Sequence, residues 1–122
     1  MKFPTNRLRR LRYNKILRDM IEDVRINPTD LICPIFIIEG TNIKEPIDTM
    51  PGQYRYSIDQ AVKLCKELIL NKINSIILFG IPLKKDNTGE ISCNSNSIIP
   101  KAIKELKNVY GDQIFIIADV CN

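Results

Sequence analysis

Three runs of apolar residues along the chain have the pattern of buried β-strands. Leu31–Ile38, Ile73–Phe79 and Ile114–Ala118 contain consecutive large apolar side chains, with little alternation between apolar and polar positions. Ile114–Ala118, with four large apolar residues in a row and then an alanine, is typical of a strand buried on both faces, as in a parallel sheet covered by helices. Pro34 lies inside the first run. Because proline cannot donate to a sheet ladder, we expect that part of the strand at an edge or a bulge.

Two segments between these runs have helical spacing. Ser57 is the expected N-cap of the first helix, and Gln60 completes the pattern of a capping box. Ser97 is the expected N-cap of the second, with Pro100 in its first turn and Gly111 at its end. The positions expected to face the core are Ile58, Ala61, Val62, Cys65, Leu68 and Ile69 in the first helix, and Ile99, Ala102, Ile103, Leu106, Val109 and Tyr110 in the second.

The alternation of strands and helices predicts an α/β domain over residues 30–122. Parallel neighbouring strands joined by right-handed crossovers are the expected topology. Residues 39–56 connect the first strand to the first helix, and a connection of this length is expected to contain short extra elements or functional residues. No glycine-rich phosphate-binding motif precedes either helix, so the sequence gives no support for nucleotide binding.

Residues 1–29 differ from the rest of the chain in charge. They carry a net charge of +5, against −1 for the rest of the chain, and their apolar residues form only a weak helical stripe. Asn27-Pro28-Thr29-Asp30 predicts a helix break and a turn. We interpret residues 1–29 as an N-terminal arm for subunit contacts. A nucleic-acid-binding arm and a mitochondrial presequence are disfavoured, because interleaved aromatic residues are lacking and serine is scarce.

Composition excludes several classes of function. No apolar run approaches the roughly 20 residues of a membrane helix, and Met1–Pro4 lack the apolar core of a secretory signal, so we expect a cytoplasmic protein with reduced cysteines and neither membrane nor nucleic-acid partners. The chain has no histidine, which excludes a Ser–His or Cys–His catalytic pair within it. The four cysteines lie far apart and none forms a C-x-x-C pair.

Asp119 and Cys121 follow the last apolar run and are the candidate site residues. In α/β folds the carboxyl ends of parallel strands carry the chemistry, so a carboxylate and a thiol there could act in catalysis or bind a metal. By spacing alone an incidental acid and a packed thiol are favoured, because a zinc site needs several ligands. Lys84 and Lys85 stand in a polar loop and are interpreted as ordinary exposed charges.

Several short motifs follow one another in a specific order along nearly the whole chain. They are Arg9-Arg10-Leu11-Arg12, Arg18-Asp19-Met20-Ile21, Asp30-Leu31-Ile32-Cys33-Pro34-Ile35-Phe36, Met50-Pro51-Gly52-Gln53-Tyr54-Arg55-Tyr56-Ser57-Ile58-Asp59, Leu78-Phe79-Gly80-Ile81-Pro82, Lys85-Asp86 with Gly89, and Asp119-Val120-Cys121. Each piece alone is a weak signal. In this order they resemble the opening of the porphobilinogen synthase family, also called delta-aminolevulinic acid dehydratase.

This resemblance implies the N-terminal portion of a (β/α)8 TIM barrel, namely the arm and about three βα units. A whole barrel takes about 250 residues, so we expect an N-terminal fragment, with three strands and two helices, that is inactive alone. The family condenses two 5-aminolevulinate molecules into porphobilinogen, with loss of two waters, in tetrapyrrole and heme biosynthesis. The resemblance also implies a homo-octamer assembled through the arms.

The resemblance assigns roles to the two candidate site residues. Asp119 matches an active-site acid, and Cys121 matches the first of three cysteines that hold a catalytic zinc in many members, whereas other members rely on magnesium. The other zinc cysteines and both Schiff-base lysines of the family have no counterpart up to Asn122, which replaces a usually apolar residue. Asp23 and Val24 also depart from the family pattern. The alternative is a self-contained small α/β binding or regulatory domain with a basic interaction arm, which would need enough strands to bury both sheet faces.

Overall fold

The computed structural model describes residues 5, 8–81 and 97–119. The three predicted strands and two predicted helices are confirmed, with their ends moved by at most two residues. No helix of the described part is long and apolar enough to cross a bilayer.

In chain order the elements are η1 (Arg10–Arg12), α1 (Lys15–Met20), η2 (Pro28–Asp30), β1 (Ile32–Ile38), β2 (Lys44–Pro46), β3 (Tyr54–Tyr56), α2 (Ile58–Leu70), β4 (Ser75–Ile81), α4 (Ile98–Tyr110), η3 (Gly111–Gln113) and β5 (Phe115–Ala118).

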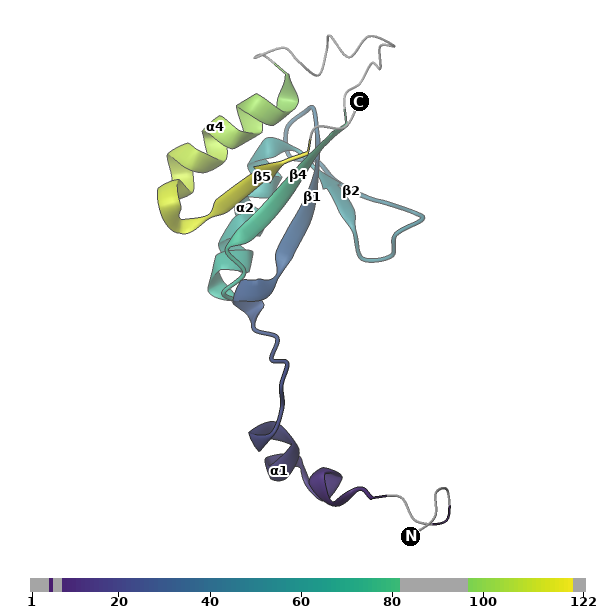
Figure 1. Cartoon of the computed structure of the whole chain (residues 1–122). Coiled ribbons are helices and arrows are strands. Elements are labelled where there is room, and N and C mark those ends of the chain that lie inside the picture. Colours follow the sequence, from purple (N-terminus) through teal and green to yellow (C-terminus); the bar gives the residue numbers. More distant parts are fainter. Residues whose placement is uncertain (1–4, 6–7, 82–96, 120–122) are drawn as a thin grey trace.

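The strands form one sheet in the order β2-β3-β1-β4-β5 (Figure 1). β1, β4 and β5 are parallel neighbours, as predicted, and β1 pairs with β4 over its whole length from Ile32↔Ser75 to Ile38↔Ile81. The connection of residues 39–56 contains β2 and β3, which confirms the expectation of short extra elements. β2 and β3 pair antiparallel, and β3 adds to β1 in parallel.

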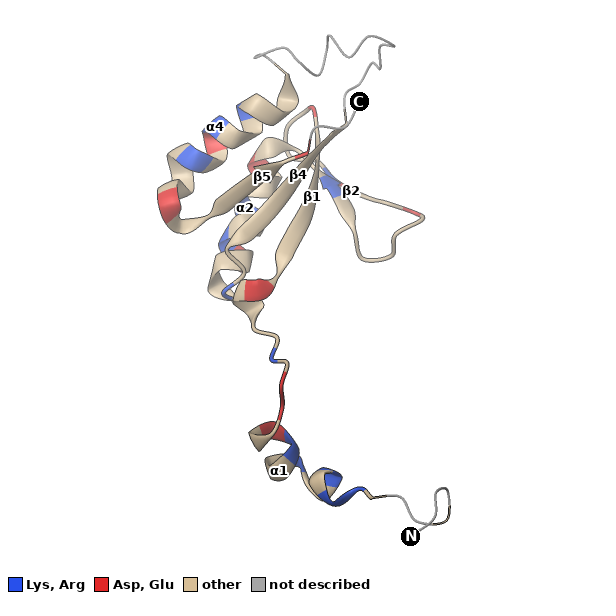
Figure 2. Ribbon diagram, in the orientation of Figure 1, with Lys and Arg blue, Asp and Glu red and all other residues tan. Residues whose placement is uncertain are grey.

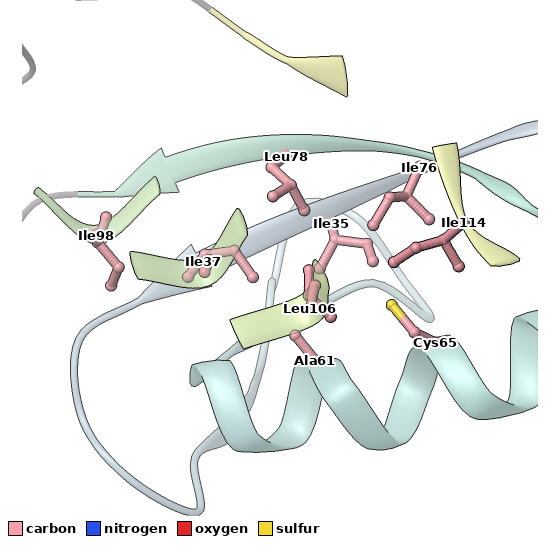
Figure 3. Close-up of a cluster of buried hydrophobic side chains, with 10 residues drawn as sticks. Ile35, Ile37, Ala61, Cys65, Ile76, Leu78, Ile98, Leu106 and Ile114 are labelled. Atoms are coloured by element: carbon pink, nitrogen blue, oxygen red, sulfur yellow. The ribbon is translucent and has the colours of Figure 1, made fainter. Parts of the chain in front are cut away.

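Both long helices pack on the same face of the sheet (Figure 3). In β1 and β4 the buried residues alternate along each strand, which places them on one face. The helix that connects β1 to β4 and the helix that connects β4 to β5 both lie on this face. Barrels wind in this way, whereas doubly wound sheets carry helices on both faces. The core consists of Ile35, Ile37, Ala61, Cys65, Ile76, Leu78, Ile98, Ala102, Leu106 and Ile114.

The opposite face of the sheet is not covered by helices of the described part. Ile32 is 52% exposed and Phe115 is 65% exposed, although both are large apolar residues inside strands. The expectation that Ile114–Ala118 is buried on both faces is therefore wrong for the described residues. Ile114 is buried on the helix-covered side, but β5 is the outermost of the described strands, and on its other side Phe115 is exposed.

Pro34 lies in β1, in the middle of the sheet, but on one side no described strand pairs with β1 at this position. It stands opposite Ile77 of β4, but β3 lies beside β1 only at Phe36 and Ile37. Among the described strands, the half of β1 that contains Pro34 therefore has an open side. An open side of this kind tolerates a residue without a backbone donor, which explains how the proline is accommodated.

The start of α2 differs from the predicted capping box. Ser57 is the N-cap residue, but its hydroxyl makes no capping hydrogen bond to the helix. The Ser57 Oγ accepts a hydrogen bond from the Ile43 amide at 2.9 Å and donates to the Asp59 carboxylate at 2.6 Å. The N-cap position was predicted, but the capping-box chemistry was wrong because the turn before β2 takes the serine side chain.

The buried face of α4 agrees with the prediction except at its two ends. Ala102 and Leu106 are fully buried, whereas Val109 is 48% exposed and Ile98, which was not assigned to the core, is 8% exposed. Gly111 follows the helix with φ +54°, a left-handed conformation that glycine adopts without steric cost, as expected for a helix end.

The N-terminal arm extends away from the sheet (Figure 1). It contains two short helical pieces, η1 and α1, where the sequence suggested one weak stripe. The Asn14 side chain caps α1 by accepting a hydrogen bond from the Leu17 amide at 2.8 Å. Most of the large apolar side chains of the arm are exposed, namely Leu8, Leu11, Tyr13, Ile16, Met20, Ile21, Val24 and Ile26.

Candidate active site

The carboxyl ends of β1, β4 and β5 meet at one edge of the sheet. The register brings Ile38 beside Ile81, and Leu78 beside Ala118. Asp119 follows directly after β5, and its amide donates a hydrogen bond to the Leu78 carbonyl at 3.1 Å. The backbone ladder therefore continues through Asp119 and holds this residue at the edge where α/β folds place their chemistry.

Alternation along the strands places Asp119 on the sheet face that the helices leave open. Ala118 is the register partner of Leu78, which is buried against the helices, so the next residue in each strand belongs to the other face. Asp119 thus lies beside Phe79 of β4. The Asp119 residue is half-buried, which leaves it accessible from the open face.

Two aromatic rings continue this row across the sheet. Phe36 of β1 is the register partner of Phe79, and their ring centroids lie 5.4 Å apart with 26° between the ring planes. The rings form an apolar wall on the open face, in the row of residues that the register extends to Asp119. Phe36 and Phe79 were not predicted as site residues. Because both strands are continuous apolar runs, only the register shows which residues face this way.

A polar cluster fixes the turn that follows β1 at the same edge. The Asn42 amide donates hydrogen bonds to both oxygens of Asp59, at 3.0 and 3.1 Å. Gln60 Nε2 donates to the Asn42 side-chain oxygen and to Asp59. Hydrogen bonds from the Ser57 hydroxyl and from the Asn42 amide lower the pKa of Asp59. We call Asn42, Ser57, Asp59 and Gln60 the loop latch.

The predicted metal ligand lies outside the described residues. Cys121, the other predicted site residue, is not placed, and neither are Lys84 and Lys85, which the sequence predicts to be ordinary exposed charges. The described residues contain no group of three or more His, Cys, Asp or Glu side chains that could hold a metal ion. They therefore do not amount to a zinc or magnesium site by themselves.

Cys33 and Cys65 do not contribute to the candidate site. Their backbone positions belong to the helix-covered side, where Cys65 is fully buried and Cys33 packs against the core. Burial raises the pKa of Cys65 to about 12, with a further increase from Cys33, and burial also raises the pKa of Cys33. Both remain thiols at neutral pH, a state in which cysteine is neither a good nucleophile nor a metal ligand.

Comparison with known proteins agrees with this geometry. A model of the delta-aminolevulinic acid dehydratase family matches residues 5–122. A delta-aminolevulinic acid dehydratase of Methanothermus sociabilis is 42% identical over 99% of the chain, and one of Helicobacter pylori strain J99 is 45% identical over 94%. The chain spans 37% and 36% of the lengths of these two relatives.

A solved structure shows the same arrangement of elements. The delta-aminolevulinic acid dehydratase (porphobilinogen synthase) of Toxoplasma gondii ME49, crystallised with its reaction product porphobilinogen, superposes with a TM-score of 0.81 at 32% sequence identity. The match covers 94% of this chain and 33% of that one.

The sheet, its helices on one face and a carboxylate at a strand end define an α/β protein built from βαβ units, with its candidate site at the carboxyl edge. Within that class, the chain belongs to the delta-aminolevulinic acid dehydratase family.

Proposed function

We propose that this chain serves the condensation of two 5-aminolevulinate molecules into porphobilinogen, with loss of two waters, in heme and tetrapyrrole biosynthesis. Membership of the family supports the reaction. The observation that carries the proposal is the position of Asp119, which stands beside Phe79 at the carboxyl edge, on the open face of the sheet. This is the place where βα-barrel enzymes hold their catalytic groups.

We propose further that the described strands form one segment of a (β/α)8 barrel. The open face, with Ile32 and Phe115 exposed, would be the inner wall, and the free edge of β5 would pair with the next strand. In a closed barrel the inward side chains fill a packed interior, which would bury these residues. The self-contained domain is disfavoured, because the described elements leave this apolar face bare.

Asp119 is proposed as the active-site acid of the reaction. A carboxylate beside an apolar aromatic wall can hold a substrate ammonium or accept and return a proton as bonds to nitrogen and oxygen change. Phe36 and Phe79 would limit water at this end of the site. The Schiff-base lysines that the resemblance implies have no assigned counterpart among the described residues.

A catalytic zinc with Cys121 as one ligand is proposed on the resemblance alone, with magnesium as the alternative metal. A zinc ion bound by thiolates can polarise a carbonyl oxygen or lower the pKa of a bound water. The described residues offer no cluster of three metal ligands.

The N-terminal arm is proposed to bind a second copy of the chain in a cytoplasmic homo-oligomer, an octamer by the resemblance. Its apolar side chains are exposed, with Ile16 at 80% and Ile26 at 77%, and its basic residues are interspersed among them (Figure 2). An exposed apolar surface of this kind is typical of a segment that is buried on association.

The role of Asp119 can be tested in a chimeric barrel. Residues 5–122 would replace the matching segment of the Helicobacter pylori relative, and porphobilinogen formation would be measured in the chimera and its variants. Asp119→Asn should lower kcat about 10²–10⁴-fold, the usual contribution of a general acid or base. Asp112→Asn, at an exposed position of η3, is the matched control. Full activity of the Asp119→Asn chimera would show that the site was assigned wrongly.

A further inference from the structure

Arg55 of β3 continues the row of side chains on the open face of the sheet. It is the register partner of Phe36 on one side of β1, as Phe79 is on the other side. Because register partners share a sheet face, Arg55 lies on the open face, at the end of the aromatic wall away from Asp119. The proposed condensation has so far given this arginine no role.

Arg55 brings positive charge to a face that is otherwise mostly apolar. The described strands contain two basic residues, Lys44 and Arg55. Lys44 is the register partner of Tyr56, which packs against the core, and its ammonium group lies 4.5 Å from the centre of the Tyr54 ring. Lys44 therefore belongs to the helix-covered side. Among the described strand residues, Arg55 is the only basic residue on the open face.

The backbone of Arg55 is fixed on both sides. β3 pairs with β1 at Phe36 and Ile37, and it pairs antiparallel with β2. The Ile47 amide donates a hydrogen bond to the Gln53 carbonyl at 3.0 Å, which ties together the two ends of the turn between β2 and β3. A side chain on a strand that is paired on both sides is positioned more precisely than one on a loop.

The guanidinium group of Arg55 uses only part of its hydrogen-bonding capacity. Arginine carries several N–H donors in a planar fork. Among the described residues its hydrogen-bond partner is Glu45, to which Nη1 donates at 3.4 Å. This single long contact joins side chains that are 36% and 54% exposed, and such an ion pair contributes little to stability. The fork can therefore still bind another carboxylate in the bidentate geometry that arginine favours.

We propose that Arg55 is a further substrate-binding residue, which holds the carboxylate of a 5-aminolevulinate molecule at the end of the aromatic wall away from Asp119. This inference rests on the proposed condensation and adds a residue to it. The Asp119 carboxylate would repel the carboxylate of the substrate, whereas the guanidinium group attracts it. In a closed barrel the rings of Phe36 and Phe79 would exclude water from this charge pair and so strengthen it.

Binding of 4-oxopentanoate to the chimeric barrel tests this proposal. This molecule is 5-aminolevulinate without its amino group, and 4-oxopentanamide is the matched ligand without the negative charge. In isothermal titration of the chimera, Arg55→Met should weaken binding of 4-oxopentanoate at least about tenfold, the effect of losing one charge-assisted hydrogen bond. Its affinity for 4-oxopentanamide should be unchanged. Arg55→Lys keeps the charge but not the fork, and should cause an intermediate loss.

Two further variants separate substrate binding from a structural role of the ion pair. Glu45→Gln removes the charge that faces Arg55 but keeps the guanidinium group, so it should not weaken binding of 4-oxopentanoate. Lys44→Met removes a positive charge from the other face of the same hairpin, and should also leave this affinity unchanged. Equal losses in Arg55→Met and Glu45→Gln would show that Arg55 acts only through the hairpin, and would overturn the proposal.

Failure of this proposal can be told apart from failure of the proposed function. A folded parent chimera that forms no porphobilinogen contradicts the condensation. A parent chimera that forms porphobilinogen contradicts only the role of Arg55 if it does not bind 4-oxopentanoate, or if Arg55→Met binds it as tightly as the parent. A circular dichroism melt of each variant establishes that it is folded.

Discussion

At the start of α2, local sequence rules predicted the end of the helix but not the hydrogen-bond partners of the Ser57 and Asp59 side chains. The serine three residues before Gln60 correctly marked the start of a helix, because N-cap preferences are local. The partners of the Ser57 and Asp59 side chains, however, are Ile43 and Asn42, which lie 14 and 17 residues away in the chain. Only the folded hairpin brings that turn to the helix, so the loop latch could not be read from the capping pattern.

The lowered pKa of Asp59 predicts a specific dependence of stability on pH. A carboxylate with a depressed folded-state pKa contributes stability above its unfolded value of about 3.9, and loses this contribution as the pH falls through its folded pKa. The thermal midpoint of Asp59→Asn should therefore lie below that of the parent chain at pH 7, and the difference should shrink in acid below about pH 4.

Circular dichroism melts between neutral and acid pH measure this effect. Asp48→Asn, in the exposed turn between β2 and β3, serves as the control and should follow the parent chain. A difference between Asp59→Asn and the parent that stayed constant with pH would show that the carboxylate charge does not hold the turn.

Asp119 and Phe79 illustrate the same limit for the site. The position of Asp119 at a strand end could be predicted, because the apolar run ends there and parallel strands end together. Phe79 could not be assigned, since an uninterrupted apolar run does not reveal which side chains face the helices. The pairing of β4 with β1 and the burial of Leu78 against the helices decide it, and both are tertiary properties.

The two long helices could be predicted best, because the spacing of their apolar residues indicates which face of each helix is buried. α4 departs from that pattern at its last turn, where Val109 extends past the edge of the core, and at its first, where Ile98 is buried under the sheet edge. The short strands β2 and β3 carry no apolar run, so only the length of the connection indicated them.

Substitutions in α4 test this division between buried and exposed positions. Leu106→Ala removes a fully buried side chain and should lower the free energy of unfolding by about 2–5 kcal/mol. Val109→Ala, at a half-exposed position, should change it by about 0.5 kcal/mol or less. Urea denaturation measures both, with unchanged m-values as the sign that the unfolding transition is the same. Equal losses in the two variants would contradict the observed packing of α4.

One face of the sheet is covered by helices, and the other face is open. The helix-covered face contains the buried core, whereas the other face exposes Ile32 and Phe115 and ends in the free edge of β5. The count of three long strands predicted this imbalance, and both helices lie on one face, as the proposed barrel wall requires. The extension of the sheet by β3 and β2 was not foreseen.

The arm should control association between copies. Ile16→Asp and Met20→Asp place a charge on exposed apolar positions, so they should leave the domain folded but shift the chain toward smaller assemblies. Size-exclusion chromatography with light scattering measures the mass. Asn14→Asp adds the same charge while keeping a favourable N-cap for α1, and should not alter the assembly. An unchanged mass for all three variants would exclude the arm from subunit contacts.

The central claim is that these residues form the first wall of a dehydratase barrel, and the activity of the chimera tests it most directly. With residues 5–122 in place of the matching segment of the Helicobacter pylori relative, the barrel should close on the open face and form porphobilinogen at a measurable rate. A chimera that melts cooperatively, and is therefore folded, but forms no porphobilinogen would contradict the account.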